Sequence, residues 1–249
     1  MKAISLLGAL LLCLAPRCGD ASQDAPRIAV IIDDFGLNYR HTPPDEDWCA
    51  LPFRLTFADM PRSPRTKKAA DLIRACGKEL IVHFPFDPFL KLELPRGGEP
   101  SARDTRLVAD LLDECFRTIP GAKGLNTHRS LKATQNPALM RWFLVEYKKR
   151  GLYFVDSAVT PKTVAYKEAL AVGVPAVKND LFLEGPHPSR EECAKVMRMA
   201  AKLARSRGEA VVIGHHYHRS TYACLKEEIP KLEKEGFEFV YASRLARRR

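Results

Sequence analysis

The sequence lacks several patterns by which a chain of 249 residues is quickly assigned to a class of protein. No two cysteines have CxxC spacing, and no aromatic-studded basic motif of an RNA-binding type occurs. The segment Asp33–Gly36, after the first predicted strand, is not a GxGxxG turn, and no GxSxG motif is present. These absences argue against a zinc ribbon, a dinucleotide-binding fold and a serine hydrolase. No repeat or low-complexity linker divides the chain, so we expect one domain.

Charged residues are scarce near the amino terminus, where Lys2 precedes the apolar run Ala3–Ala15. This run is shorter than the about 20 apolar residues that a membrane-spanning helix needs. Small residues around Ala21 follow it, which is the order of a secretory signal peptide. We therefore expect residues 1–21 to be a signal peptide and residues 22–249 to form a domain exported to the periplasm or outside the cell. An uncleaved amino-terminal anchor, with peripheral membrane association, is the alternative.

Cysteines give no disulfide framework. Of seven in the chain, two fall in the predicted signal peptide, which leaves an odd number. One or two bridges and buried inert thiols are both compatible with their spacing. The remaining cysteines are Cys49, Cys76, Cys115, Cys193 and Cys224.

The net charge of +10 raises the question of an acidic partner. The basic residues are scattered along the chain, which favours a solvated basic surface over a nucleic-acid interface. The one dense basic run, Arg244–Arg249, is interpreted as a frayed carboxyl terminus. We expect no nucleic-acid partner.

Strand-like and helix-like segments alternate along the predicted mature chain. The predicted strands are Arg27–Asp33, Leu55–Phe57, Glu79–Phe84, Gly124–His128, Leu152–Val155, Val174–Val177, Ala210–Ile213 and Phe237–Tyr241. The predicted helices are Thr66–Cys76, Ala102–Thr118, Pro137–Arg150, Pro161–Ala171, Ser189–Ser206 and Thr221–Glu235. Repetition of strand, loop and helix predicts a parallel sheet with crossover helices. We expect a single α/β domain, a distorted (β/α)7-type barrel.

Polar residues that can ligate metal or move protons follow strand after strand. In a parallel barrel all carboxyl ends of strands open on one face, where such folds place their active sites. A single acid at a strand end is more often a helix cap, but repeated acids, imidazoles and amides are hard to explain by capping. The residues are Asp33, Asp34, His83, Asn126, His128, Asp156, Asp180 and His215.

The adjacent acids Asp33 and Asp34 cannot both point the same way from an extended strand, because successive side chains alternate. Where the backbone bends at the strand end, one acid can bind a metal while the other faces a substrate. This arrangement suits metal-assisted hydrolysis at a zinc-like site of mixed nitrogen and oxygen ligands. The alternative is that one of the two acids caps the following loop.

The segment from His215 to His218 contains three imidazoles. If the chain stays extended there, His216 points away from the side that His215 faces. We therefore expect only His215 to act, as a general acid at the last strand of the site. His216 and His218 are interpreted as rim or solvent residues.

Six short segments carry a family resemblance. They are Ile28–Gly36, Val82–Pro88, Gly124–His128, Phe154–Ser157, Asp180–Glu184 and Ile213–Tyr217. In order and spacing they resemble the motifs of the divergent polysaccharide deacetylases, relatives of the metal-dependent carbohydrate esterases. The resemblance runs from about Arg27 to Arg244, nearly the whole predicted mature chain.

The resemblance implies a distorted barrel with a divalent metal, zinc being favoured, that removes acetyl groups from an envelope or extracellular glycan. By position, Asp33 would be the general base and His215 the acid. Asp34 and His128 would be metal ligands, with His83 a further ligand or a substrate contact. The residues expected to contact the substrate are Asn126, Asp156, Ser157, Asp180 and Tyr217.

The chain departs from the family's pattern at positions that bear on turnover. Lys132 stands where ordinary deacetylases carry a second histidine, and Leu131 where serine is common. Ala158 stands where arginine usually follows the Asp-Ser pair. These differences favour an alternative in which the fold binds carbohydrate in the envelope with reduced catalysis. Hydrolysis of another amide or ester would use the same site.

Overall fold

The computed structural model describes residues 25–40, 42–86 and 101–247. The predicted signal peptide therefore lies outside the described residues. The strands are β1 (Arg27–Phe35), β2 (Leu55–Asp59), β3 (Glu79–Pro85), β4 (Gly124–His128), β5 (Tyr153–Asp156), β6 (Ala176–Lys178), β7 (Leu181–Phe182), β8 (Glu209–His215) and β9 (Glu238–Val240). The helices are α1 (Asp45–Ala50), α2 (Thr66–Ala75), α4 (Ala102–Thr118), α5 (Pro137–Lys148), α6 (Ala165–Val172), α7 (Arg190–Arg207) and α8 (Arg219–Lys234), with 3-10 turns η1 (Ala133–Gln135) and η2 (Ala242–Arg244).

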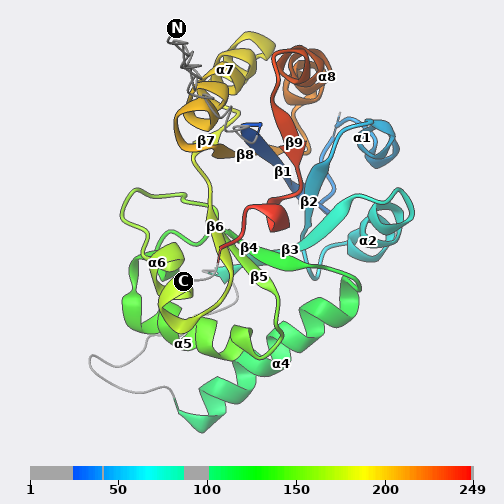
Figure 1. Cartoon of the computed structure of the whole chain (residues 1–249). Helices are drawn as coiled ribbons and strands as arrows, with labels where there is room; N and C mark the ends of the chain where they lie inside the picture. Colours follow the sequence, from blue (N-terminus) through cyan, green and yellow to red (C-terminus); the bar gives the residue numbers. More distant parts are fainter. Residues whose placement is uncertain (1–24, 41, 87–100, 248–249) are drawn as a thin grey trace, which may run out of the picture.

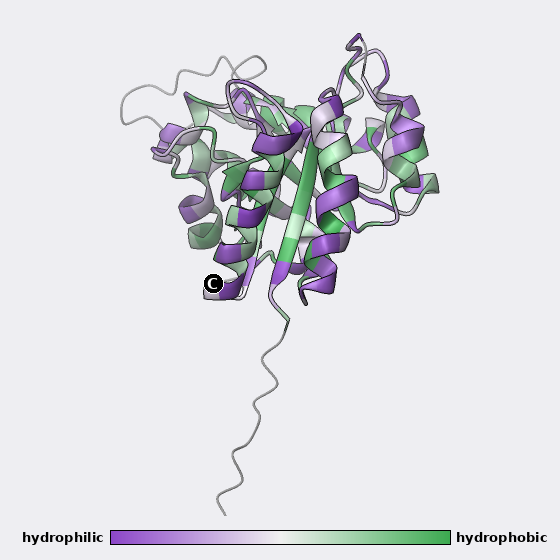
Figure 2. Ribbon diagram, turned by 90° about the horizontal axis from the view of Figure 1, so that it is seen from above, coloured by the Kyte–Doolittle hydropathy of each residue, from purple (hydrophilic) through white to green (hydrophobic). Residues whose placement is uncertain are grey.

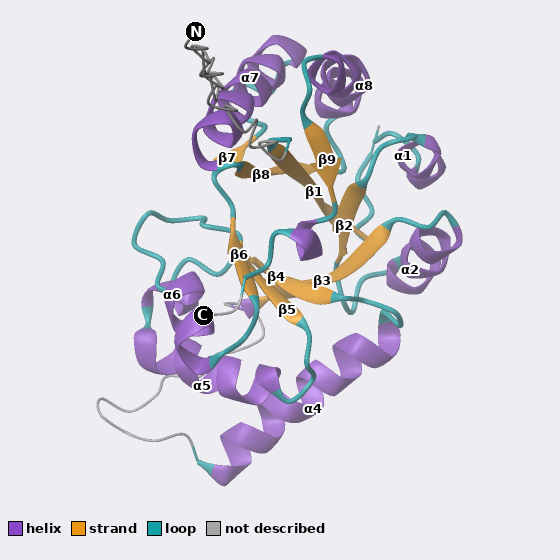
Figure 3. Cartoon of the chain, viewed as in Figure 1, coloured by secondary structure: helices purple, strands orange, loops and turns teal. Residues whose placement is uncertain are grey.

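The strands form one curled parallel sheet in the order β6-β5-β4-β3-β2-β1-β8-β7, and β9 pairs with the beginning of β1. Within this strand order β6 and β7 are not paired, so the barrel is open there; we call this gap the seam. The helices lie outside the sheet (Figures 1 and 3). The prediction of a single α/β domain with a distorted barrel is confirmed.

Alternation along each strand divides the apolar residues into two groups. Ile28, Val30 and Ile32 of β1 face the layer between the sheet and the helices. Ala29 and Ile31 face the barrel interior. The strands at the centre are therefore hydrophobic, while many helix residues are hydrophilic (Figure 2).

Local sequence explains the boundaries of the helices. Ser101 begins α4 with a capping box that includes Asp104, and Asn136 caps α5, whose first residue is a proline. Helix α6 begins at Ala165, later than predicted, because Thr163 donates its hydroxyl to Asp156 and the intervening residues form a turn. The short helix α1 and strand β7 were not predicted.

The chain beyond β9 closes part of the barrel. Leu245 is buried with the interior residues, and Arg247 forms an antiparallel bridge with Ala176 of β6. Arg247 also pairs with Glu209 at the start of β8, at 2.8 Å. The interpretation of Arg244–Arg249 as a frayed end is therefore wrong as far as Arg247, the last described residue, because its backbone pairs with a strand edge.

Two disulfides join neighbouring helices. Cys49 of α1 is bonded to Cys76 at the end of α2, and Cys193 of α7 to Cys224 of α8. Cys115 is a buried free thiol. In the described part of the chain, no helix has the length and apolar character needed to cross a membrane.

Candidate metal and active site

Both acids at the end of β1 face the barrel interior, which alternation alone would forbid. Asp33 follows Ala29 and Ile31 on the interior side, whereas Asp34 has a φ of 72° and lies in a bulge between Ile32 and Phe35. The bulge shifts the alternation by one residue, so that Phe35 packs in the outer layer. The bend expected from the sequence thus brings the two carboxylates to one side.

Asn126 of β4 connects the acids to the first histidine. Its amide nitrogen donates to Asp33 Oδ1 at 2.7 Å, and its Oδ1 lies 2.7 Å from His83 Nδ1. Because Asn126 Oδ1 can only accept, His83 Nδ1 is the donor. The Nε2 atom of His83 is thereby directed toward the acids and is available as a ligand.

Three side chains converge beside this network. His83 Nε2 lies 2.9 Å from His128 Nδ1, 3.3 Å from Asp34 Oδ1 and 3.7 Å from Asp33 Oδ2. One ligand atom each from Asp34, His83 and His128 lies within 4.8 Å of the others. Asp34 Oδ1 is buried and accepts no hydrogen bond from the described residues. A divalent cation would satisfy this oxygen and both imidazoles, and one carboxylate with two imidazoles is a donor set that suits zinc.

The two acids differ in the direction of their pKa shifts. Burial raises the pKa of Asp33. Burial also opposes the ionisation of Asp34, but the close approach and the charge of His83, whose Nε2 lies 3.3 Å from Asp34 Oδ1, outweigh this and lower the pKa of Asp34. Asp34 is therefore the more readily charged carboxylate, as a ligand requires, and Asp33 is the one that more readily takes a proton.

The pKa values of the two imidazoles, His83 and His128, are also shifted in opposite directions. Burial lowers the pKa of His128 to about 3, so its ring is neutral at physiological pH. Burial acts in the same direction on His83, but the charges of Asp33 and Asp34 overcome it and raise its pKa to about 9. The acids thus favour a positive charge at His83, and a metal ion bound at Nε2 would take the place of the proton there.

His215, the last residue of β8, lies on the other side of Asp33. Its Nδ1 is 2.9 Å from Glu184 Oε2, and its backbone N–H donates to Glu184 Oε1 at 2.9 Å. Thr221 also donates to Glu184 Oε1, at 2.6 Å. Burial alone would lower the pKa of His215, but the bond to Glu184 raises it. Sequence reasoning gave Glu184 no role, although it ends one of the six motifs.

Aromatic rings border the site. Tyr217 lies 5.6 Å from the His215 ring and 4.4 Å from both Tyr39 and His218, measured between ring centroids. Burial, with the charge of Asp34, raises the pKa of the Tyr217 hydroxyl to about 12. Tyr217 is therefore an uncharged hydroxyl on a partly exposed aromatic rim, where a sugar ring could lie.

Asp156 and Ser157 bond to backbone and loop groups rather than facing an open site. One carboxylate oxygen of Asp156 accepts from the N–H of Ala158, and the other from Thr163 and the N–H of Tyr166. The hydroxyl of Ser157 accepts from the N–H of Thr127 at 3.3 Å. Both side chains hold the loop after β5, which is the capping role that a lone acid at a strand end usually has.

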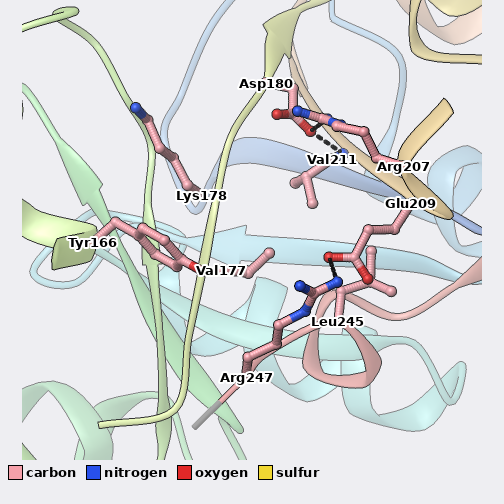
Figure 4. A pocket seen from close by; sticks show the side chains of 9 residues that line it. All are labelled: Tyr166, Val177, Lys178, Asp180, Arg207, Glu209, Val211, Leu245 and Arg247. Atoms are coloured by element: carbon pink, nitrogen blue, oxygen red, sulfur yellow. Dashed lines mark hydrogen bonds and ion pairs between the residues drawn. The ribbon is translucent and has the colours of Figure 1, made fainter. Parts of the chain in front are cut away.

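Asp180 does not join the site, contrary to the prediction that it lies on the same face. Its Oδ2 accepts from the N–H of Val211 at 2.9 Å and lies 2.8 Å from Arg207. Val211 is near the start of β8, whereas His215 ends that strand. The chain enters β7 directly after Asp180, so the carboxylate satisfies the neighbouring strand. Figure 4 shows it in a cavity beside the seam.

His216 is not a rim residue, which corrects the sequence interpretation. It is buried, its ring lies 4.6 Å from Phe35, and its Nε2 is 2.8 Å from Asp45 Oδ1. Its backbone N–H donates to the carbonyl oxygen of Asp33 at 2.9 Å. His216 and Asp45 thus support the strand end from behind. His218 does lie at the rim, at the position before α8, and its side chain makes no capping hydrogen bond.

A parallel barrel with acids and imidazoles at the carboxyl ends of β1, β3, β4 and β8 defines an α/β-barrel protein with a hydrolase-type site. Residues 30–246 match the model of the divergent polysaccharide deacetylases, and the chain belongs to this family. Family membership supports a hydrolase, and the described residues contain one Asp/His/His group that could hold a metal ion.

The curated relatives found have no described function. An uncharacterized Haemophilus influenzae protein is 28% identical over 192 residues, covering 76% of this chain and 66% of the relative. The uncharacterized protein YibQ of Escherichia coli K12 is 29% identical over 209 residues, covering 84% of this chain and 64% of YibQ. The chain thus spans slightly less than two thirds of the length of these relatives.

Solved structures share the fold at low identity. An uncharacterized Agrobacterium tumefaciens protein, ATU2773, has a TM-score of 0.73 at 17% identity, with 89% of each chain covered. The Bc1960 peptidoglycan N-acetylglucosamine deacetylase has a TM-score of 0.54 at 15% identity, with 91% of each covered. A mutant of BA3943, a CE4 family pseudoenzyme with restored activity, has a TM-score of 0.54 at 14% identity, covering 90% of this chain and 68% of that one.

Proposed function

We propose that the protein is a metal-dependent hydrolase that removes acetyl groups from a carbohydrate of the cell envelope or the extracellular space. The observation that carries this proposal is the convergence of Asp34, His83 and His128, with the buried Oδ1 of Asp34 lacking a hydrogen-bond partner among the described residues. Asp33 and His215 flank this group, as a base and an acid on either side of a scissile bond would.

Asp34, His83 and His128 would hold the ion, which we propose to be zinc. A bound divalent ion supplies Lewis-acid polarisation of a carbonyl group and of water. His83 replaces the imidazole that ordinary deacetylases carry at the position of Lys132, because β3 and β4 are neighbours and bring His83 beside His128. Asn126 fixes the orientation of His83.

Asp33 acts as the general base that takes a proton from the attacking water. Its carboxylate is buried, its pKa is raised, and one oxygen is held by Asn126 while the other lies on the side of His83. A raised pKa favours proton uptake by a carboxylate in the transition state. Asn126 thereby orients the base and the ligand His83 together.

His215 acts as the general acid that donates a proton to the leaving nitrogen or oxygen. Glu184 raises its pKa, so the ring is more often protonated at neutral pH, and binds its Nδ1. The Nε2 atom is left to face the reacting group. Tyr39 and Tyr217 supply aromatic surface for the sugar.

Metal content and deacetylation of acetylated glycans test this function together. The wild-type protein is expected to bind one divalent ion and to release acetate. Asp34→Asn and His128→Ala lose both properties, whereas His187→Ala, a matched change outside the site, retains them. A protein that binds no divalent ion under supplementation contradicts the proposal. Glycan binding that survives Asp33→Asn, in a protein without deacetylase activity, selects the carbohydrate-binding alternative.

We also propose that the protein is exported, with residues 1–21 as its signal peptide. Two disulfides support an oxidising compartment, because such bonds are rare in reducing cytosol. Fractionation of cells that express the full chain tests this: the protein is expected outside the cytoplasm, and removal of residues 2–21 should retain it inside. Cytoplasmic location of the full chain contradicts export.

A further inference from the structure

A cleft lies directly beside the candidate metal ligands. It has a volume of about 280 Å³, and His128 forms part of its wall. The other lining residues come from the loops after β1 and β2, the end of β3, and the residue after β4. They are Leu37, Tyr39, Met60, Pro61, Arg62, Ser63, Pro85 and Arg129. A substrate whose acetyl group lies at His128 would extend into this cleft.

The charge of the cleft is positive. Among the described residues that line it none is acidic, and two are arginines. Arg62 is neutralised by Glu114, which receives hydrogen bonds from both Nε and Nη2 of the guanidinium. Arg129 has no ion-pair partner in the part of the chain that the structure describes. Arg129 is therefore the unbalanced charge of the cleft.

Local structure holds the backbone of Arg129 in place. It lies between His128 and the fully buried Ser130, whose carbonyl oxygen accepts from the N–H and the hydroxyl of Thr134. Its φ of 43° is unusual for a residue with a side chain. Its charge acts on Tyr39 and His128, lowering the pKa of each, although burial has the larger effect on both. The Arg129 side chain thus lines the same cleft as Tyr39 and His128 and is close enough for its charge to act on both.

The cavity beside the seam shows how differently charge is arranged elsewhere. There Arg207 is paired with Asp180 and Arg247 with Glu209, and Lys178 lines the same wall (Figure 4). The acids of that cavity lie on its wall next to the cations. In the cleft at His128 the described residues of the wall offer an unpaired cation and no acid, which is an arrangement that suits an anionic ligand.

We propose that the glycan substrate is acidic, and that Arg129 binds a carboxylate on the sugar unit next to the one that carries the acetyl group. The inference rests on the proposed carbohydrate substrate and specifies its class. An arginine recognises a carboxylate with two parallel hydrogen bonds, which fixes the orientation of the sugar as well as its position. Arg129 is in this sense a specificity-determining residue.

Two oligosaccharides of equal length test the inference. A hyaluronan hexasaccharide alternates N-acetylglucosamine with a uronate, whereas a chitin hexasaccharide is neutral. Dissociation constants are measured for the full chain without signal peptide, loaded with zinc, at low and high salt. Because a bound divalent ion attracts any anion, the informative quantity is the change produced by Arg129 variants. Arg106→Gln, a change of an exposed arginine on α4, is the matched control.

The wild type and Arg106→Gln are expected to bind the acidic hexasaccharide roughly fivefold more tightly than the neutral one, with the preference decreasing at high salt. Arg129→Gln should abolish most of the preference and Arg129→Glu should reverse it. Equal binding of both sugars by the wild type, or an unchanged preference in Arg129→Glu, overturns the inference of an acidic substrate and leaves the proposed carbohydrate substrate standing. If neither sugar binds the wild type, the carbohydrate substrate fails, and this inference fails with it.

Discussion

At the scale of single residues, polar groups of the site act through partners that orient them. Asn126 links Asp33 to His83, and Glu184 links His215 to Thr221. In each case a second side chain fixes which nitrogen of an imidazole faces the reacting groups. Mutation of such partners at metal sites typically reduces metal affinity or activity by about tenfold to a hundredfold.

Glu184→Gln should therefore impair His215 without removing it. Glu184 raises the pKa of His215 against the effect of burial, so the variant has a lower pKa at this ring. The alkaline limb of the pH–rate profile should move to lower pH, and kcat should decrease roughly tenfold to a hundredfold. Deacetylation rates between pH 5 and pH 10 would measure both effects. Glu191→Gln, at an exposed position of α7, should behave as the wild type.

A buried acid behind the site makes stability depend on pH. Asp59, at the end of β2, is fully buried, and neither oxygen has a hydrogen-bond partner in the described part of the chain. Burial, reinforced by the charge of Asp45, raises its pKa from 3.8 to about 8. The folded protein therefore binds a proton that the unfolded chain releases above pH 4, and stability falls as the pH rises from about 4 to 8.

Asp59→Asn should remove this pH dependence. The variant is expected to equal the wild type in free energy of unfolding near pH 4. Relative to the wild type, the variant should become more stable as the pH rises, by on the order of 2 kcal/mol in free energy of unfolding at pH 8. Urea denaturation at several pH values is the measurement. A gain that is the same at every pH would show that Asp59 is charged throughout.

The positions of the site acids and imidazoles were predictable, because parallel strands bring their carboxyl ends to one edge. The structure places His83 and His128 together with the Asp33–Asp34 pair for this reason. The failures have physical causes that need coordinates. Both carboxylate oxygens of Asp156 accept hydrogen bonds from the loop that follows β5. Asp180 lies directly before β7, and its carboxylate accepts a hydrogen bond from the neighbouring strand β8.

At the scale of elements, the disulfides cross-link pairs of helices that already pack against each other. Loss of the α7–α8 bond through the double change Cys193→Ala and Cys224→Ala should lower the free energy of unfolding by about 2–4 kcal/mol. Unfolding curves with and without a reducing agent would show the effect. Cys115→Ala, which removes no cross-link, should leave the sensitivity to reductant unchanged. A wild type that is insensitive to reductant contradicts a stabilising role for the bonds.

Element types were predicted well where periodicity is strong, as in α4 and α7. Helix α1 was not predicted because its six residues follow two prolines and are too few to show a helical periodicity. Strand β7 escaped because it has only two residues and exists through its pairing with Val212 and Ile213 of β8. Both elements depend on tertiary contacts, which the local sequence does not contain.

For the whole molecule, the carboxyl-terminal segment substitutes for the missing pairing at the seam. Leu245→Ala should destabilise the barrel by about 2–4 kcal/mol, because its side chain is 2% exposed in the interior group. Leu107→Ala, at a position 51% exposed, should change stability by less than about 0.5 kcal/mol. Thermal and urea unfolding would compare the two. Equal effects would mean that the segment does not contribute to the barrel's stability.

The bulge at Asp34 sets activity and stability against each other. The left-handed backbone at this residue, with φ of 72°, suits glycine better than any residue with a side chain. Asp34→Gly would relieve both this conformation and the repulsion from Asp33, so a selection for stability alone would drift toward glycine there. Retaining an acid at the bulge is then a mark of selection for what the site does. In variant libraries sorted separately for folding and for metal binding, the first selection should enrich glycine at position 34 and the second should enrich aspartate.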